Sequence, residues 1–294
     1  MASKELQNII NQKLDNPIDI NLPVDLRRKH LEHNAIPPPK EALIKKEKIN
    51  DNLCYWVTMP NSKTDRLFFF IHGGGYTMGS AESSFSLASW IANETESKVF
   101  SINYRLAPEN PFPAAIEDTV DIYNWILSKG FLPKKLCVGG ISAGGGLALA
   151  LLLFLKENSI SYPACSVLLS PWTDLSQSGD TYESKNIIDP VIKKEFLQSW
   201  AEDYLQGQEF SNPLASPIFG DLSQLPPTLI QVGKSEVMLS DSQRLFVKSK
   251  KLGSPVEIEE WPEMFHGWHN HYDFLLESKQ AIKSIGKFVK KNIK

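Results

Sequence analysis

Cysteine is scarce in this 294-residue sequence, which contains only Cys54, Cys137 and Cys165. An odd number of cysteines with no C-x-x-C spacing argues against a disulfide framework and against a cysteine-based zinc site. Each of the three lies in or beside an apolar run. We therefore expect buried thiols in a reducing compartment.

The sequence also has no apolar run long enough to cross a membrane. The longest, Leu147 to Leu155, is well short of the roughly 18 residues that a spanning helix needs. The N-terminal stretch MASKELQNIINQKLDN lacks the apolar core of a signal peptide. The formal net charge of −3 gives no general attraction to nucleic acid or anionic lipid. We expect a cytoplasmic protein with no membrane span and no nucleic-acid partner.

The sequence does contain a regular alternation of strand and helix patterns. Short apolar runs predict strands at 53–58, 67–71, 99–102, 135–138, 166–169, 228–232 and 256–260. Longer segments predict helices at 83–94, 113–128, 143–157, 240–252 and 268–293. This alternation is typical of an α/β fold, in which helices cover both faces of a mostly parallel sheet.

Two segments stand outside this alternation, residues 1–45 and about 176–216. Helical spacing of apolar side chains predicts short helices at about 4–14 and 23–33. This leader could be a flexible tail, but packing as a lid over a main domain of residues 46–294 is favoured, because its apolar side chains are otherwise hard to bury. The second segment is polar, partly helical and placed between two core strands. An insertion above the carboxyl ends of the strands is where a substrate-covering element would sit.

The most informative stretch is Gly140-Ile141-Ser142-Ala143-Gly144, between a predicted strand and a predicted helix. Its G-x-S-x-G spacing is that of a nucleophile elbow, a turn so sharp that its central residue is strained and its neighbours two places away must be small. The serine hydroxyl would stand at a helix N-terminus, where free N–H groups stabilise negative charge. Ser142 is therefore the candidate nucleophile.

Three consecutive glycines follow His72, directly after the predicted strand 67–71. Without Cβ atoms, Gly73-Gly74-Gly75 lets the backbone approach a ligand and direct its N–H groups at one point. A phosphate-binding loop is not favoured, because the Lys-Ser/Thr of a P-loop and the G-x-G-x-x-G of a dinucleotide site are both missing. The loop is a candidate for binding an oxyanion.

Candidates for a catalytic acid and base lie near the C-terminal end of the sequence. Glu236 follows a predicted strand and is favoured as the acid over Asp241, which falls in the first turn of the next helix, where aspartate commonly stabilises the helix terminus. His266 follows the last predicted strand and is favoured as the base. His269 and His271 are expected in or next to the final helix, and no thiolate or carboxylate completes a familiar metal motif with them.

Together these motifs resemble the hormone-sensitive-lipase-like carboxylesterases of the α/β-hydrolase fold, the group called family IV among bacterial esterases. The resemblance runs from about Leu67 to the end of the sequence. Besides the elbow, it rests on His72–Gly75, Tyr104–Glu109, Phe112–Ala115 with Asp118, Ser170–Asp174 and Phe265–Trp268.

The resemblance implies an α/β-hydrolase fold with about eight strands and a helical cap. It implies no metal and no organic cofactor. The roles that it implies are nucleophile for Ser142, base for His266, acid for Glu236, and oxyanion hole for the N–H groups of Gly74, Gly75 and Ala143. It also implies that Arg105 and Glu109 tie loops together behind the site.

The elbow departs from the family's pattern at Ile141, where members usually have Asp or sometimes Thr. An isoleucine side chain cannot hydrogen-bond the neighbouring loops, and a β-branched residue does not ease a strained turn. We therefore expect the elbow of this chain to be less rigid than that of its relatives.

These observations predict a serine carboxylesterase that hydrolyses small-molecule esters through an acyl-enzyme. Aromatic residues expected near the site suggest a modest apolar pocket and short acyl chains, with Tyr76 and Trp172 as candidate substrate-binding residues. The others of this set are Trp90, Phe196, Trp200 and Trp268. An amidase, a lactonase or an acyltransferase with the same triad remains an alternative, as does a non-catalytic ligand-binding homologue. The resemblance also makes a homodimer through the last strand and helix an expectation.

Overall fold

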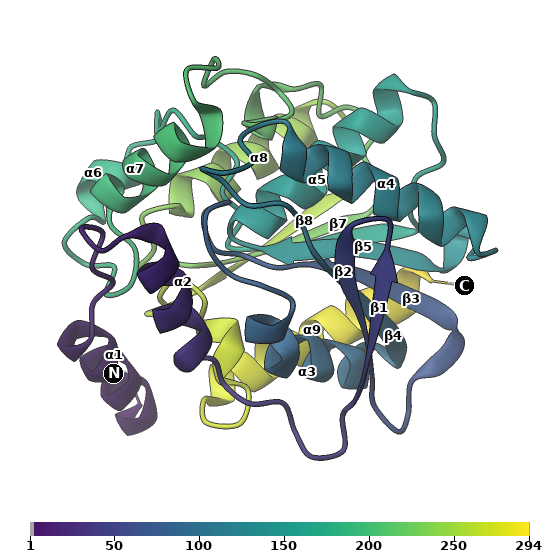
Figure 1. Cartoon of the computed structure of the whole chain (residues 1–294), viewed down its shortest axis with the longest axis horizontal. Coiled ribbons are helices and arrows are strands. Elements are labelled where there is room, and N and C mark those ends of the chain that lie inside the picture. The colour runs from purple at the N-terminus through teal and green to yellow at the C-terminus, as the bar shows by residue number, and fades with distance from the viewer. Residues whose placement is uncertain (1–2, 294) are drawn as a thin grey trace.

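A computed structural model describes residues 3–293 and contains one eight-stranded sheet in the order β1-β2-β4-β3-β5-β6-β7-β8 (Figure 1). β2 is antiparallel to both of its neighbours, β1 and β4, and the other neighbouring strands are parallel. The strands are β1 (Leu43–Ile49), β2 (Asn52–Thr58), β3 (Lys63–Ile71), β4 (Ser97–Asn103), β5 (Leu136–Ile141), β6 (Cys165–Leu169), β7 (Thr228–Gly233) and β8 (Val256–Trp261). The predicted α/β-hydrolase sheet is confirmed.

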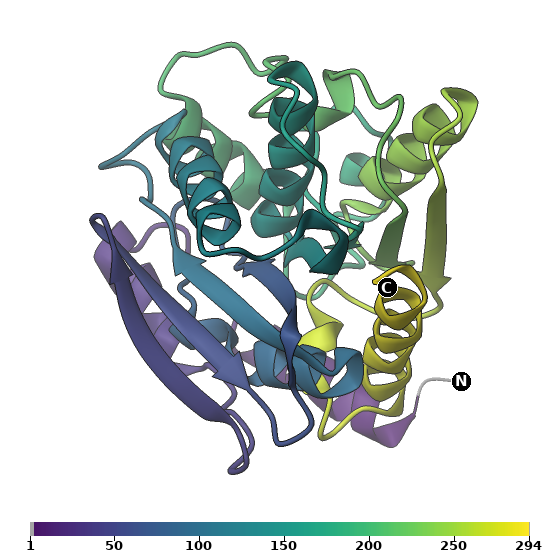
Figure 2. The same cartoon turned by 90° about the vertical axis from the view of Figure 1, so that its right-hand side faces the viewer.

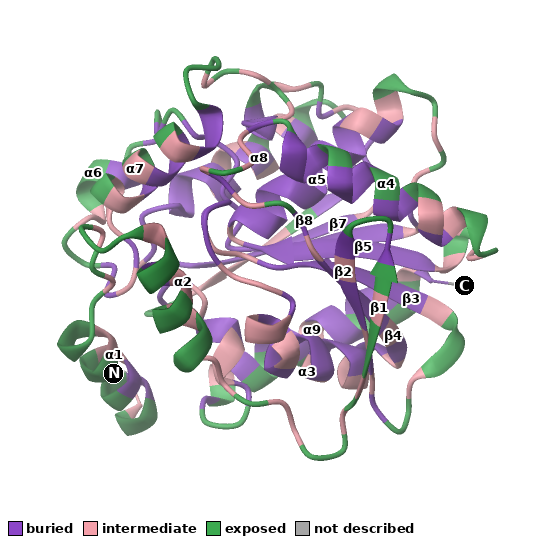
Figure 3. Ribbon diagram, viewed as in Figure 1, coloured by how far each residue is buried: buried purple, intermediate pink, exposed green. Residues whose placement is uncertain are grey.

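Helices cover both faces of this sheet. Figures 1 and 2 show α3 (Phe85–Thr95) and α9 (Leu276–Asn292) on one face, with α4 (Ala114–Ser128), α5 (Ala143–Glu157) and α8 (Leu239–Lys251) on the other. The central strands are therefore buried on both sides, which is why Leu67–Ile71 and all of β5 read as continuous apolar runs. Figure 3 shows the buried residues concentrated in the sheet and on the inner sides of the helices.

The largest differences from the expected elements concern an edge strand and the final helix. β1 was not predicted, and it begins inside the segment of residues 1–45 that was assigned to the N-terminal helices. Its sequence LIKKEKI is mostly exposed, as suits an edge strand protected by lysines, and only Ile49 is buried. The sequence predicts a final helix at 268–293, but a separate 3-10 turn (Trp268–His271) precedes α9, because Leu275 adopts an extended conformation between them.

The N-terminal helices α1 (Lys4–Asp15) and α2 (Val24–His33) group with α6 (Thr181–Ser184) and α7 (Lys194–Leu205) beyond one end of the sheet (Figure 1). The apolar side of α1 buries Leu6 and Ile9 in a cluster that includes Phe265 and Trp268. On α2, the Arg28 guanidinium donates to the carbonyls of Thr77 and Ala107, each at 2.8 Å. The helix α2 therefore rests on the loops that follow the carboxyl ends of β3 and β4.

The three cysteines lie inside this core. Cys54 on β2, Cys137 on β5 and Cys165 on β6 are buried free thiols, as expected, and the last two face each other across neighbouring strands. Within residues 3–293, no helix combines the length and the apolar character required to traverse a bilayer.

Candidate active site

The candidate nucleophile lies on a strained turn. Ser142 stands between β5 and α5 with φ 57° and ψ −124°, a region that side-chain-bearing residues rarely adopt. Hydrogen bonds on both sides hold it there. Its N–H donates to the Leu169 carbonyl at 2.9 Å, and its own carbonyl accepts from the N–H groups of Gly146 and Trp172, each at 3.0 Å.

Glycine is required on both sides of this turn. A Cβ added to Gly140 would lie 2.3 Å from the carbonyl oxygen of Gly144, and one added to Gly144 would lie 2.2 Å from that of Ile71. Both obstacles are backbone atoms that cannot rotate away. The prediction that both positions must be small is confirmed, and the reason is close approach of the backbone.

Ile141, the departure from the family's pattern, is 6% exposed and packs in the apolar cluster between the sheet and the helices α3 and α9. The isoleucine thus exchanges a polar contact for apolar burial. That the elbow is less rigid than that of its relatives stays a prediction.

The structure brings together Glu236 and His266 as expected. Glu236 Oε2 lies 2.9 Å from Nδ1 of His266, and Oε1 accepts from the Ser170 hydroxyl at 2.7 Å and from the Gly233 N–H at 2.6 Å. The carboxylate is fully buried. The two loops also touch through their backbones, since the Ser235 N–H donates to the Met264 carbonyl at 3.1 Å.

Electrostatics at this pair favour a charged imidazole. Burial alone would lower the pKa of His266, but the hydrogen bond to Glu236 and the charges of Glu236 and Asp189 outweigh it and raise the pKa above its ordinary value. Because Nδ1 is bonded to Glu236, Nε2 is the ring nitrogen left for proton exchange with a substrate or nucleophile.

No hydrogen bond joins the Ser142 hydroxyl to His266 among the described residues. Nε2 of His266 also lacks a hydrogen-bond partner among these residues. It is not one of the fully buried unpaired atoms, so solvent can reach it. Hydrogen bonds of this kind commonly tighten only when substrate is bound.

The alternative residues have other partners. Asp241 Oδ2 accepts from the backbone N–H groups of Thr173 and Asp174, at 2.8 and 2.9 Å, and so fixes the loop after β6. His269 is buried, with Nε2 3.2 Å from the Gln231 side-chain oxygen. His271 packs edge-on against Phe265, and burial followed by the charge of Lys13 lowers its pKa to about 4. Among the described residues, no hydrogen bond joins Asp241, His269 or His271 to Ser142, Glu236 or His266.

The glycine loop reaches the elbow as the sequence suggested. A Cβ on Gly73 would lie 2.9 Å from the Ile141 carbonyl oxygen, and Gly74 and Gly75 have φ values of 116° and 61°. Within residues 3–293 the N–H groups of Gly74 and Gly75 donate to no protein atom. The N–H of Ala143, the first residue of α5, has no acceptor within its own helix. All three amides are thus free to bind an oxyanion.

Tyr76 and Trp172, the candidate substrate-binding residues, do not present an exposed ring face to a substrate. Tyr76 is 1% exposed and Trp172 is fully buried, and the Tyr76 ring is stacked on Tyr204 of α7 at 3.9 Å. In this conformation both rings are packing residues beneath the loops of the site. A different ring approaches the glycine loop, that of Trp200 of α7, whose Cε3 lies 2.5 Å from the position of a Cβ on Gly75.

Two polar residues near the pair were not predicted. Ser170 directly follows the carboxyl end of β6, just as Ser142 follows that of β5. This position in the sequence could have indicated that Ser170 lies at the site. Asp189 lies in the segment of residues 176–216, is fully buried, and accepts from the N–H of Val237 at 3.1 Å. No local pattern marks Asp189, because its contact depends on that segment folding back onto the Glu236 loop.

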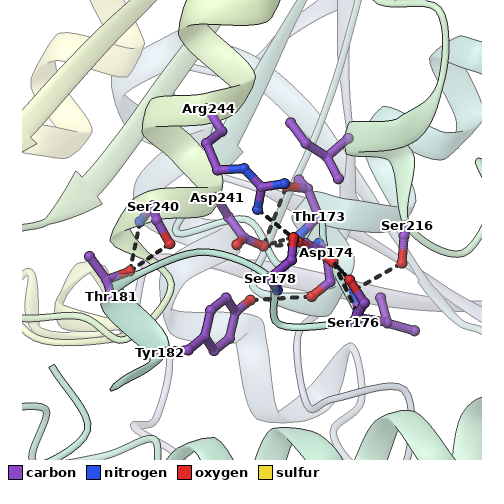
Figure 4. Close-up of polar contacts among 12 residues, drawn as sticks. Thr173, Asp174, Ser176, Ser178, Thr181, Tyr182, Ser216, Ser240, Asp241 and Arg244 are labelled. Carbon is purple, nitrogen blue, oxygen red and sulfur yellow. Dashed lines mark hydrogen bonds and ion pairs between the residues drawn. The ribbon is translucent and has the colours of Figure 1, made fainter. Parts of the chain in front are cut away.

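A polar network next to Asp241 holds the start of the segment of residues 176–216 in place (Figure 4). Asp174 is fully buried, accepts from the Ser176 and Ser178 hydroxyls and pairs with Arg244 of α8 at 2.7 Å. Burial, followed by the charge of Asp174, raises the pKa of Asp241 to about 7. The network attaches the start of the segment to α8, the helix that follows the Glu236 loop.

Known proteins share this chain's sequence and fold. A family model described as alpha/beta hydrolase fold matches residues 68–270. An acetyl-hydrolase from Streptomyces hygroscopicus is 40% identical over 235 residues, which cover 80% of this chain and 78% of that protein. An esterase from Acinetobacter venetianus is 35% identical over 224 residues, covering 76% and 74%.

Solved structures give the same result over the whole chain. The crystal structure of an esterase from the bacterial hormone-sensitive lipase family has a TM-score of 0.97 at 36% identity and covers 100% of both chains. An esterase/lipase from an uncultured bacterium has a TM-score of 0.95 at 34% identity, covering 99% of both. The resemblance inferred from the motifs is confirmed. This chain belongs to the α/β-hydrolase family and, within it, to the bacterial hormone-sensitive lipase group of carboxylesterases.

Proposed function

We propose that this protein hydrolyses short-chain carboxylic esters, with Ser142, His266 and Glu236 as its catalytic triad. One observation carries the proposal. A buried carboxylate and an imidazole are hydrogen-bonded at 2.9 Å in loops at the same sheet edge as a serine held at positive φ. This combination of nucleophile, base and orienting acid performs acyl transfer.

In this mechanism, Nε2 of His266 takes the proton of Ser142 as the hydroxyl oxygen attacks the ester carbonyl. Glu236 stabilises the imidazolium and fixes the tautomer through Nδ1. The N–H groups of Gly74, Gly75 and Ala143 bind the oxyanion. His266 then protonates the departing alcohol, and water attacks the acyl-enzyme by the same steps in reverse to release the acid.

The small acyl group is supported by what packs around the glycine loop. Trp200 of α7 lies against Gly75, so a large aromatic ring stands next to one of the proposed oxyanion amides and limits the room for an acyl chain there. The relative that is 40% identical is named an acetyl-hydrolase. A p-nitrophenyl ester series should show the highest kcat/KM for acetate to butyrate. Highest turnover on chains beyond about ten carbons would contradict the short-chain preference.

A serine-directed organophosphate tests the nucleophile directly. We expect stoichiometric labelling of the wild-type protein and none of Ser142→Ala, because only a serine activated by a base reacts rapidly. A wild-type protein that is not labelled would instead indicate a ligand-binding homologue. Parallel assays with anilides, lactones and alcohol acceptors would separate the ester hydrolase from an amidase, a lactonase or an acyltransferase.

We further propose that the N-terminal helices of residues 1–45 and the segment of residues 176–216 together form a cap over the site. The contacts of Arg28 with the loops after β3 and β4, and of Trp200 with Gly75, support it. A homodimer through β8 and α9, and a cytoplasmic location, remain predictions. Analytical ultracentrifugation and cell fractionation would test them.

A further inference from the structure

The segment of residues 176–216 sends two buried side chains to a single residue next to Glu236. The Thr181 hydroxyl donates to the Val237 carbonyl at 2.7 Å, and Asp189 Oδ2 accepts from the Val237 N–H at 3.1 Å. Thr181 also accepts from the Ser240 N–H at 2.9 Å (Figure 4). The residue that follows the candidate catalytic acid is thus held at both its N–H and its carbonyl by the same segment.

The surroundings of Asp189 are unusual for a carboxylate. It is fully buried, its Oδ1 accepts from the N–H groups of Val191 and Ile192 at 2.9 and 3.1 Å, and among residues 3–293 no lysine or arginine pairs with its carboxylate. Lys193 instead donates to the backbone carbonyl of Asp189 at 2.5 Å. A buried carboxylate without a cationic partner is costly in free energy, and such groups concentrate at functional sites.

We infer that Asp189 is a positioning residue for the catalytic pair: its carboxylate fixes the Glu236 loop through the Val237 amide, one residue from the carboxylate that binds His266. This inference rests on the proposed triad. It gives the segment of residues 176–216 a part in the chemistry besides covering the site. On this inference, the Glu236 loop takes its final position only when the segment of residues 176–216 is packed against Val237.

The charges around His266 support this role. The titratable groups that act on it are Glu236 and Asp189, both negative when ionised, and it acts in turn on His269, which burial keeps neutral. Burial, opposed by the charge of His266, raises the pKa of Asp189 to about 6, so Asp189 is ionised at neutral pH and above. Removing its charge should lower the pKa of His266.

Asp189→Asn and Thr181→Val form a matched pair of tests. The amide introduced by Asp189→Asn keeps an acceptor for Val191 and Ile192 but loses the charge and the bond to Val237. The Thr181→Val change loses a bond to the same residue with no change of charge. Imidazole nitrogen NMR shifts, assigned with His266→Asn, report the pKa of His266 in each variant. We expect a fall of roughly one pH unit in Asp189→Asn and no shift in Thr181→Val.

Kinetics should follow the NMR result. For Asp189→Asn we expect kcat to fall about tenfold with little change in KM, and the acid limb of kcat/KM to move to lower pH by the same amount as the pKa. An unchanged His266 pKa in Asp189→Asn, or an equal shift in Thr181→Val, would overturn the inference. A wild-type protein without esterase activity would refute the proposed function instead, and the NMR titration would still stand.

A measurement on the unmodified protein covers the case in which Asp189→Asn does not fold. The carboxyl carbon of Asp189 should show the chemical shift of an ionised carboxylate by pH 8. A carboxyl that is still protonated at pH 8 cannot supply a negative charge to His266, and that result would also overturn the inference.

Discussion

Nδ1 of His266 lies 2.9 Å from the carboxylate of Glu236, and the other oxygen of that carboxylate is bound by Ser170 and Gly233. A carboxylate fixed in this way orients the imidazole and stabilises its charged form. The nearby carboxylate of Asp241 binds backbone amides of the loop after β6 instead. The two acids thus have separable functions.

Glu236→Gln should lower kcat by about 10⁴-fold, because a neutral amide can select the wrong tautomer and does not stabilise the imidazolium. Asp241→Asn is the matched control, since it removes a buried carboxylate near the same helix without touching His266. Steady-state kinetics on p-nitrophenyl acetate would measure both. Equal losses in the two variants would argue against Glu236 as the catalytic acid.

The acid limb of kcat/KM should have its midpoint above pH 6.5. A protonated imidazole cannot accept the serine proton, and the pKa of His266 is raised above that ordinary value. Burial lowers the pKa of His72 to about 4 and that of His271 to about 4, so neither can produce such a limb. A pH–rate profile with circular dichroism at each pH gives the midpoint. A limb near pH 4 with the fold intact would assign the base elsewhere.

Gly144→Ala should destabilise the protein severely, by about 3 kcal/mol or more, because the new methyl would meet the carbonyls of Ile71 and His72 at 2.2 and 2.3 Å. Gly145→Ala, one residue along the same helix, meets Pro171 at 3.0 Å and the Gly140 carbonyl at 3.2 Å, and it gains helix propensity. Urea unfolding should therefore show a much smaller change for Gly145→Ala. Similar losses would mean that the elbow backbone can shift to make room.

Ile141→Asp should lower stability by about 3 kcal/mol, because position 141 is buried in an apolar cluster, where a carboxylate is costly. Ile141→Val, which keeps an apolar side chain, is the control and should cost about 1 kcal/mol. Thermal and urea unfolding would measure both. An aspartate variant that melts higher than wild type would show instead that the family's usual residue finds its polar contact here.

Asp241 should make stability fall as pH rises. Its pKa is about 7 in the folded protein against an ordinary 3.8, so between about pH 4 and 7 the folded state holds a proton that the unfolded state has lost. The favourable contribution is therefore complete at low pH and is lost as pH rises through 7. Asp241→Asn keeps an acceptor for the two amides and should flatten this slope. Urea unfolding at pH 5 and pH 8 tests it, and parallel slopes for wild type and variant would contradict the assignment.

Most of the fold was predictable because its strands are apolar runs buried on both faces, of which Leu67–Ile71 is the clearest. Glu236 and His266 were predictable because each follows a strand in the order that this fold requires. β1 was not, since a lysine-rich edge strand has no apolar run and is held by hydrogen bonds to β2.

Other features of the site depend on contacts between residues far apart in the sequence. Asp189 meets Val237 only because the segment of residues 176–216 folds back onto the Glu236 loop. The burial of Tyr76 and Trp172 could not be predicted either, because the aromatic character of a residue does not reveal whether its ring faces an open site or the core.

The burial of all three cysteines has a practical consequence for watching this enzyme work. Burial first, and the charges of Glu47 and Asp118 next, raise the pKa of Cys54 to about 12, and Cys137 and Cys165 are fully enclosed between strands and helices. Alkylating reagents need an accessible thiolate, so we expect the folded chain not to react with maleimides. A single cysteine introduced at Ile187, which is 93% exposed, would then carry a fluorophore at one defined point without any background mutation.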